Sequence, residues 1–474
     1  MPDNTIERLF QERFGEPYKK CEPLPHSGSN RRYYRLTASD GTTVLAVHND
    51  DASENKAYLS FTQTFTDSGI NVPKVLSHDD TLCYYLVEDI GRETLYDLVT
   101  AADGNPDSEL IKLFSKVLDD LAKIQISAGQ KIDYSLCIGS QNFDQTAIQW
   151  DLNYFKYCYL KNAHINFDEQ KLETDFETIK QAVAGTDNQY FMFRDFQSRN
   201  IMLKNGTPYY IDFQGGKHGP LAYDVASLLY QAKAKLSEDT RNLLFDKYLE
   251  SVHKLLDIDT VQLKREFKIF ALIRTLQVLG AYGYRGYYEK KQHFIESIPF
   301  ALTNLKNLLA LNILPLPHLC EIADKIEIKE PEKDDYNGLT VTVVSFSYKK
   351  GIPTDTETGG GFVFDCRGQH NPGRYDEYKM LTGRDQPVID FLKANSTIDS
   401  FLAQAIDIVT PTIEKYIERG FTKLMVCFGC TGGQHRSAYC AQNFAEAISK
   451  KLDIRVRLIH RELKINQLFT PSIS

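Results

Sequence analysis

The stretch that decides the fold lies at residues 193–216, FRDFQSRNIMLKNGTPYYIDFQGG. Asp195 and Asn200 stand five residues apart on a predicted loop, and Asp212 follows at the end of a predicted strand. Phosphoryl transfer needs such a set of groups. One carboxylate takes the proton of an acceptor hydroxyl, while a second carboxylate and an amide oxygen hold Mg²⁺ against the nucleotide phosphates. The same side chains can instead merely cap turns, but the whole stretch fits the first interpretation as a set.

The segment before this stretch is predicted to be a small β-rich lobe, residues 1–90. Residues 35–48 predict a hairpin turning at Asp40-Gly41, and 54–68 have helical spacing. Another strand pair is expected within 72–90. Glu54, on the predicted helix, either pairs with a phosphate-binding side chain or lies on a solvated face.

After Gly91 the apolar residues recur with a helical period, which predicts a mainly helical lobe over residues 91–327. Asn205-Gly206 marks a tight turn in the one β-like island of this lobe. Asp224 is expected to cap or brace a helix rather than to take part in chemistry. The predicted helices cover residues 107–127, 146–163, 167–184, 221–232, 236–255 and 260–282.

A charged, turn-rich segment at 328–338 is predicted to be a linker. Beyond it, strands and helices alternate over 339–474, with helices near 398–419 and 435–451. This alternation predicts a separate α/β domain with a mostly parallel sheet. The β-rich lobe and the helical lobe before it form an α+β bilobal part, whose resemblance to the protein-kinase fold rests on the motifs described below.

The charge and apolar patterns restrict the class of protein. The 474 residues carry 55 Lys and Arg against 63 Asp and Glu, so bulk charge does not hold the chain to nucleic acid. Residues 337–474 alone hold 17 basic and 14 acidic side chains, which indicates two parts with different surfaces. The apolar stretches are too short for a membrane span, and the N-terminal stretch does not resemble an export signal. A cytoplasmic location with reduced thiols is expected, and no contact with a membrane.

The spacing matches the kinase pattern H-R-D-x-x-x-x-N with some replacements. Phe193 stands in place of the first His, Gln214 in place of the Gly that follows Asp-Phe, and His48 in place of the strand lysine. The phosphate-covering loop, SGSNRRYYR, contains a single glycine. Backbone amides and guanidinium groups there are expected to hold nucleotide phosphates. The residues concerned are Ser29, Asn30, Arg31 and Arg32.

Residues 1 to about 327 resemble the aminoglycoside phosphotransferase/choline kinase superfamily, and within it the anomeric N-acetylmuramate/N-acetylglucosamine kinases. The resemblance rests on SNRRYYRL, LVEDIG, FRDFQSRNIM, IDFQGGKHGPLAYDVASLL and RTLQVLGAYG. It implies ATP binding at the interlobe hinge formed by Glu88, Asp89 and Ile90. It also implies that Asp195 is the base and that Asn200 and Asp212 bind Mg²⁺.

A second strong signal is KLMVCFGCTGGQHRS, residues 423–437, in which an apolar strand runs through a glycine-rich turn into a helix. Converging backbone amides, a hydroxyl and an arginine at such a turn suit an oxyanion. Cys430 and Arg436 also have the C-x5-R spacing of cysteine phosphatases, so a thiolate nucleophile is a further alternative. The candidate anion-binding residues are Cys430, Thr431, Gly432, Gly433, Gln434, His435 and Arg436.

Residues 339–474 resemble the C-terminal domain of the RapZ family of RNase adapter proteins, on the motifs VSFSYKKGIP, FVFDCRGQHNP, LTGRDQPVIDFL and GCTGGQHRS. The resemblance implies binding of a phosphorylated amino sugar, self-association into a homo-oligomer, and contact with RNA. Basic side chains that would face RNA are Lys450, Lys451, Arg455, Arg457, Arg461 and Lys464, although a solvated face is the default for such a run.

These observations together predict an ATP- and Mg²⁺-dependent kinase that acts on a small amino sugar of the N-acetylmuramate or N-acetylglucosamine type. The C-terminal domain is then expected to sense a phosphorylated amino sugar. The alternative is a regulatory or RNA-binding adapter with a degenerate kinase half. The replacements at Phe193 and His48 favour it, as does Gln197, at a position that is often His in the family that this half resembles.

Overall fold

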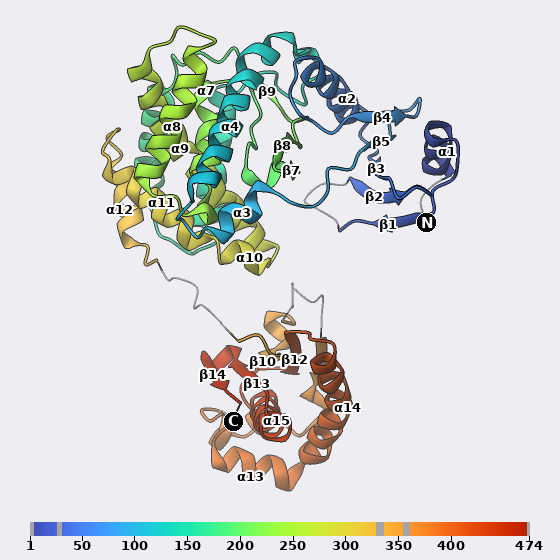
Figure 1. Cartoon of the computed structure of the whole chain (residues 1–474). Coiled ribbons are helices and arrows are strands. Elements are labelled where there is room, and N and C mark those ends of the chain that lie inside the picture. Colours follow the sequence, from blue (N-terminus) through green and yellow to red (C-terminus); the bar gives the residue numbers. More distant parts are fainter. Residues whose placement is uncertain (1–3, 26–30, 329–335, 354–360, 472–474) are drawn as a thin grey trace. The chain divides into compact units, whose positions relative to one another are not determined.

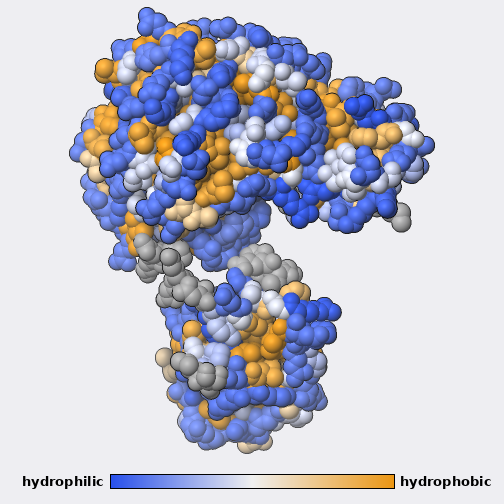
Figure 2. All heavy atoms as spheres, in the orientation of Figure 1, coloured by the Kyte–Doolittle hydropathy of each residue, from blue (hydrophilic) through white to orange (hydrophobic). Residues whose placement is uncertain are grey.

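The computed structural model describes residues 4–25, 31–328, 336–353 and 361–471. The chain divides into two compact units, one formed almost entirely by residues up to 330 and the other by residues from 331 onward. Most of the predicted linker, 329–335, lies outside the described residues, as do Ser29 and Asn30. Figure 2 shows hydrophilic residues over much of the visible face of each unit. In the part of the chain that is described, no helix combines the length and the apolar character that a membrane crossing requires.

The first lobe is an antiparallel sheet in the order β1-β2-β3-β5-β4 with a helix against each face (Figure 1). The predicted hairpin is present, with Arg32 paired to His48 and Thr37 to Thr43. Side chains alternate across the sheet, so Val44 and Ala46 of β3 pack against α1, while Val47 packs against α2. The elements are α1 (Asn4–Phe14), β1 (Lys20–Pro23), β2 (Arg32–Thr37), β3 (Thr43–His48), α2 (Ala52–Asp67), β4 (Val75–His78) and β5 (Tyr84–Glu88).

The second lobe is mainly helical, and the long helix α9 (Thr260–Gly283) runs through its core. A Cβ at Gly283 would lie 2.2 Å from the carbonyl oxygen of Cys158, which belongs to the helical segment Phe155–Leu160. Glycine therefore allows α9 to pass close to the backbone of that segment. The other helices are α3 (Leu95–Ala101), α4 (Ser108–Lys123), α5 (Gln145–Tyr154), α6 (Glu169–Ala182), α7 (Leu221–Leu229), α8 (Glu238–His253), α10 (Gln292–Ile295), α11 (Ile298–Ala310) and α12 (Pro317–Lys325).

The predicted β-island consists of two small antiparallel pairs. Strand β7 (Ile201–Lys204) pairs with β8 (Thr207–Tyr210) around the Asn205-Gly206 turn, as predicted. Strand β6 (Tyr190–Met192) pairs with β9 (Lys217–Gly219). Asp195 and Asn200 follow β6, whereas Asp212 follows β8. The topology therefore brings the ends of two strands to one place. A small β-sheet lobe followed by a helical lobe is the bilobal kinase-like fold.

The second unit has the predicted mostly parallel sheet, in the order β11-β12-β10-β13-β14, of which only the edge strand β14 is antiparallel. The strand ends Ser347 and Cys430 are register partners, so the carboxyl ends of β10 and β12 lie at the same edge. The elements are β10 (Thr340–Ser347), β11 (Gly361–Asp365), α13 (Gln386–Asn395), α14 (Ile398–Glu418), β12 (Lys423–Cys430), α15 (Arg436–Leu452), β13 (Arg455–His460) and β14 (Ile465–Phe469).

Candidate active site

The loop between β6 and β7 brings Asp195, Asn200 and Asp212 together. The Nδ2 atom of Asn200 donates to the backbone oxygen of Asp195 at 2.9 Å and lies 3.4 Å from Oδ2 of Asp212. Asp212 has φ +66°, in the left-handed region that few residues other than glycine adopt. Strained backbone of this kind concentrates at functional sites. The Asn200 side chain thus lies between the backbone of Asp195 and the carboxylate of Asp212.

Asp195 is held by an arginine from α9. Its Oδ1 atom accepts a hydrogen bond from Nη2 of Arg274 at 2.7 Å, and its side chain is 45% exposed. Burial acts to raise the pKa of Asp195, but the positive charge and hydrogen bond of Arg274 outweigh it and lower that pKa below its usual value. The carboxylate is therefore ionised at neutral pH and can accept a proton from a hydroxyl group.

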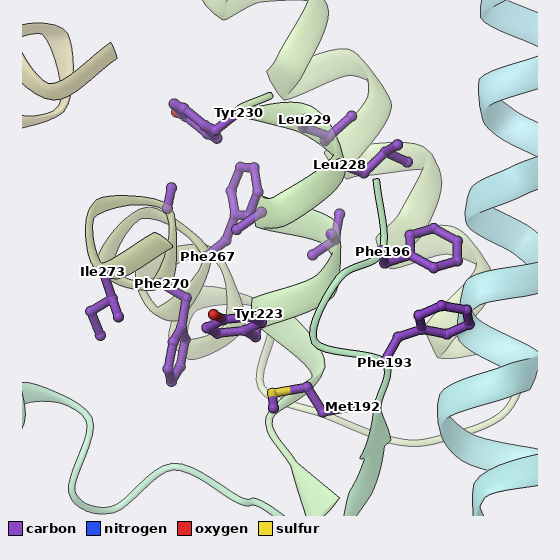
Figure 3. Close-up of a cluster of buried hydrophobic side chains, with 14 of the residues drawn as sticks. Met192, Phe193, Phe196, Tyr223, Leu228, Leu229, Tyr230, Phe267, Phe270 and Ile273 are labelled. Carbon is purple, nitrogen blue, oxygen red and sulfur yellow. The ribbon is translucent and has the colours of Figure 1, made fainter. Parts of the chain in front are cut away.

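Asp224 holds the backbone of the same loop. It is fully buried on α7, and its two carboxylate oxygens accept hydrogen bonds from the backbone N–H groups of Phe193 and Arg194, at 2.6 and 2.9 Å. Burial raises the pKa of Asp224 to about 7, while these two donors act in the opposite direction. The rings of Phe193 and Phe196 project to one side of the loop (Figure 3). Asp224 thus braces the loop through its backbone and does not cap a helix, which corrects the expectation.

A buried arginine faces the same cluster from the sheet lobe. Arg31 is 4% exposed, and its Nη2 atom lies 3.0 Å from Oε1 of Glu54, on α2. Gln214 links this pair to the island, because its Nε2 atom donates to Asp212 at 2.9 Å and to Glu54 at 3.4 Å. A continuous polar chain therefore runs from Arg31 to Asp212. Arg32, by contrast, is exposed.

His48 occupies the β3 position at which kinases of the common pattern carry a lysine. Its ring stacks on Tyr84 with centroids 4.4 Å apart, and its Nε2 atom lies 3.2 Å from Asp50. Glu54, the acidic residue of α2 that such a lysine would pair with, is paired with Arg31 instead. The cation of this ion pair therefore comes from the start of β2 and not from β3.

The predicted hinge residues connect the two lobes through side chains. Glu88 forms an ion pair of 2.6 Å with Lys204 on β7. Asp89 accepts two hydrogen bonds from Arg35, at 2.6 and 2.9 Å, and Ile90 is buried. The pair of Glu88 with Lys204 therefore connects the hinge to β7, whereas Asp89 ties it to Arg35 on β2.

The donor set suits a hard divalent cation. Among the described residues, no group of three or more His, Cys, Asp or Glu side chains is arranged to hold a metal ion. Mg²⁺ commonly uses only one or two protein ligands and takes the rest from substrate phosphates and water. One carboxylate, Asp212, and one amide, Asn200, on adjoining strand ends match that mode.

The glycine-rich loop of the second unit folds around the sulfur of Cys430. The N–H group of Gly433, which has φ +73°, lies 3.2 Å from this sulfur, and Oγ of Ser437 lies 3.1 Å from it. The Oγ atom of Ser347, at the end of β10, donates to the carbonyl oxygen of Thr431 at 2.6 Å. Cys430 and Gly433 are buried, whereas the other loop residues before His435 are exposed, namely Thr431, Gly432 and Gln434.

The start of α15 is fixed to the surrounding loops. His435 donates from Nε2 to the carbonyl oxygen of Tyr378 at 2.9 Å. The Nη1 atom of Arg436 donates to the carbonyl oxygens of Arg367 and Gln369, both at 3.0 Å. This nitrogen of Arg436 therefore supports the loop after β11, whereas exposed Thr431 and Gly432 face outward at the head of the helix.

Comparison with known families gives a match for each of the two units. The profile described as the phosphotransferase enzyme family matches residues 20–258, half of the chain. The chain belongs to this family. Among solved structures, the phosphotransferase is similar to a choline kinase of Cryptosporidium parvum, with 13% identity, a TM-score of 0.45 and coverage of 64% of this chain and 94% of that one. An ADP-bound aminoglycoside phosphotransferase has 14% identity, a TM-score of 0.43 and coverage of 66% and 98%.

The second unit of the phosphotransferase matches a different family. Residues 339–464 match the profile described as the RapZ C-terminal domain. A nucleotide-binding protein of Chromobacterium violaceum is 36% identical over 136 residues, which are 28% of this chain and 47% of that protein. One from Ralstonia nicotianae is 40% identical over 142 residues, 29% and 45% of the two chains. The phosphotransferase thus spans less than half the length of these curated relatives.

Sequence reasoning did not identify Arg274 as part of the candidate site. This residue is 79 positions away from Asp195 in the chain. A signal was nevertheless present, because Arg274 interrupts the apolar stretch FALIRTLQVLG of a core helix. A charge that is 4% exposed in such a helix requires a partner, and Asp195 provides it.

Proposed function

We propose that the protein is an ATP- and Mg²⁺-dependent kinase whose acceptor is an amino sugar of the N-acetylglucosamine or N-acetylmuramate type. The observation that carries this proposal is the cluster of Asp195, Asn200 and Asp212, with Arg274 holding the first of them. Membership of the phosphotransferase family and the kinase-like fold support the reaction class. The choice of an amino sugar rests on the motif resemblance of the first 327 residues.

In the proposed reaction, Asp195 orients the acceptor hydroxyl and takes its proton. The hydroxyl oxygen forms a bond to the γ-phosphorus as the bond between that phosphorus and the ADP oxygen breaks. Arg274 keeps the carboxylate ionised before transfer. A divalent ion held by Asn200 and Asp212 would neutralise charge on the nucleotide phosphates.

Nucleotide binding is assigned to the start of β2 and to the hinge. Arg31, paired with Glu54, is proposed to contact the phosphates, since its guanidinium group lies at one end of the polar chain to Asp212. The hinge from Glu88 to Ile90 is proposed to contact the base.

The C-terminal unit is proposed to bind a phosphorylated amino sugar at the loop from Thr431 to Arg436. The head of α15, at Arg436, offers the partial positive charge of a helix N-terminus. Thr431 and Gly432 are exposed there and can reach a phosphate group. Cys430 is buried beneath the loop, which favours binding over attack by the thiol.

The direct test is to incubate the full chain with ATP, Mg²⁺ and single sugars, and to measure ADP release and sugar phosphate. Sugar-dependent ADP release that is lost in Asp195→Asn supports the proposal. Absence of sugar-dependent turnover across N-acetylglucosamine, N-acetylmuramate and unmodified hexoses would remove it.

A second candidate function is an RNA-binding adapter. Lys450, Lys451 and Arg457 are exposed around the end of α15 and β13. Two other basic residues are used internally, since Arg455 donates to Thr340 and Arg461 donates to the carbonyl oxygen of Ser347. RNA binding that weakens steeply with salt and falls in Arg457→Gln would support this function.

A further inference from the structure

A small cavity lies beside Arg274, the residue that holds the candidate base, between the loop after β6 and helices α7, α9 and α11. The lining includes the polar residues Gln197, Ser227, Gln231, Arg274, Thr275 and Asn304, together with two tyrosines. Several of these groups already have partners. Gln231 accepts from both the N–H and hydroxyl groups of Ser198, and Asn304 binds Arg241 and the carbonyl oxygen of Tyr230.

Three buried polar atoms that belong to this lining have no hydrogen-bond partner among the described residues. They are Oγ of Ser227, Oγ1 of Thr275 and Nε of Arg274. The three residues are only 3–4% exposed. An unpartnered buried polar group typically costs about 1–3 kcal/mol, so a cluster of three at one cavity needs an explanation. A ligand group that enters the cavity supplies the missing partners.

Arg274 connects the cavity to Asp195, the candidate base. Arg274 lines the cavity, and its guanidinium group donates from Nη2 to Asp195. A group bound at Nε is therefore one guanidinium away from the carboxylate that takes the acceptor proton. The free space suits one polar substituent of an acceptor rather than a whole sugar ring.

The charges of the cavity select among acceptors. Among the described residues that line it, none carries a carboxylate, and its one cation, Arg274, is neutralised by Asp195. A cationic amine would lose its hydration there and gain no counter-ion. A neutral hydroxyl or amide oxygen can accept from Arg274 and exchange hydrogen bonds with the two hydroxyl groups.

We propose that this cavity binds an uncharged hydroxyl or acetamido substituent of the sugar acceptor and so selects N-acylated or neutral sugars over cationic amino sugars. This inference rests on the proposed sugar kinase activity. Ser227 and Thr275 determine specificity in this scheme, and Arg274 both binds the substituent and positions Asp195.

The experiment compares Ser227→Ala, Thr275→Val and the double variant with the wild-type full chain. Ser251→Ala is the matched control, since Ser251 is also buried but donates to the carbonyl oxygen of Lys247 within α8. Initial rates are measured against N-acetylglucosamine and glucosamine, which differ in the acetyl group and in charge. We expect wild-type kcat/KM to be at least about 10-fold higher for N-acetylglucosamine. We expect KM for that sugar to rise about 10-fold in each single variant and about 100-fold in the double variant, with KM for ATP unchanged.

The outcomes separate this inference from the proposed function. If the wild type turns over the acetylated sugar and the variants keep its KM, the cavity only traps water and the inference is wrong, while the kinase assignment stands. A preference for glucosamine also overturns it. If no sugar is phosphorylated, the kinase assignment fails. Calorimetric titration of N-acetylglucosamine into the full chain then tests the cavity on its own. Binding that is lost in the double variant supports the cavity, and absent or unchanged binding overturns it. Equal or higher melting temperatures in the variants exclude misfolding.

Discussion

Replacing Arg31 by Gln tests whether the cation beside Glu54 takes over the phosphate contact that a β3 lysine provides in kinases of the common pattern. Glu54 is 24% exposed and also accepts from Asn49 at 2.9 Å, so loss of the ion pair leaves it hydrated and bonded. We therefore expect a stability cost of only about 1 kcal/mol, typical of a part-exposed pair. Hydrogen bonds to charged groups contribute about 1.5–3 kcal/mol, which corresponds to a loss in kcat/KM for ATP of roughly 10- to 150-fold.

The assay is initial-rate kinetics with varied ATP at saturating acceptor, alongside thermal melting. Arg32→Gln is the matched control, because Arg32 is the next residue and is exposed at the start of β2. It should keep kcat/KM for ATP within about 3-fold, because an exposed charge contributes little to a specific contact. If Arg31→Gln retains its kinetics for ATP while Arg32→Gln loses them, the assignment of the phosphate contact to the buried arginine is refuted.

Three further predictions concern titratable groups. Asp195→Asn should lower kcat roughly 100- to 10,000-fold with little change in KM for ATP, because a positioned general base usually contributes that much. Coupled ADP assays measure this, and a smaller loss of kcat would contradict the role of Asp195 as the base. Asp224 keeps its proton to about pH 7 in the folded protein but only to about pH 4 when unfolded. The unfolding free energy should therefore fall by on the order of 4 kcal/mol as pH rises between these values, a dependence that melting curves should not show for Asp224→Asn. Burial, aided by the charge of Arg384, lowers the pKa of His460 to about 4. The unfolding free energy should thus fall by on the order of 3 kcal/mol as pH falls from about 6.5 to 4. His460→Gln should remove this fall, and a variant that keeps it would show that the His460 ring is not the group responsible.

The elements that the sequence predicted well are those set by short-range pattern. The hairpin from β2 to β3, the Asn205-Gly206 turn and the helices α4 to α9 follow from side-chain periodicity and turn residues. Helices α1, α3, α10, α11 and α13 were missed, as was α12. The last of these begins at Pro317, where a proline suited to a first helical turn is easily taken for the end of an element.

The sequence alone determined the inventory of the candidate site: an aspartate, an asparagine and a second aspartate at fixed spacing on strand ends, and a glycine-rich turn before a helix. Spacing along a loop is local, so it can be recognised in one dimension. Only the tertiary structure decided the partners of those groups, among them Arg274 for Asp195, Arg31 for Glu54 and the cavity beside them. These pairings depend on which distant faces pack together, and the buried charges and hydrogen-bonding groups placed there by packing acquire their strength from the exclusion of water.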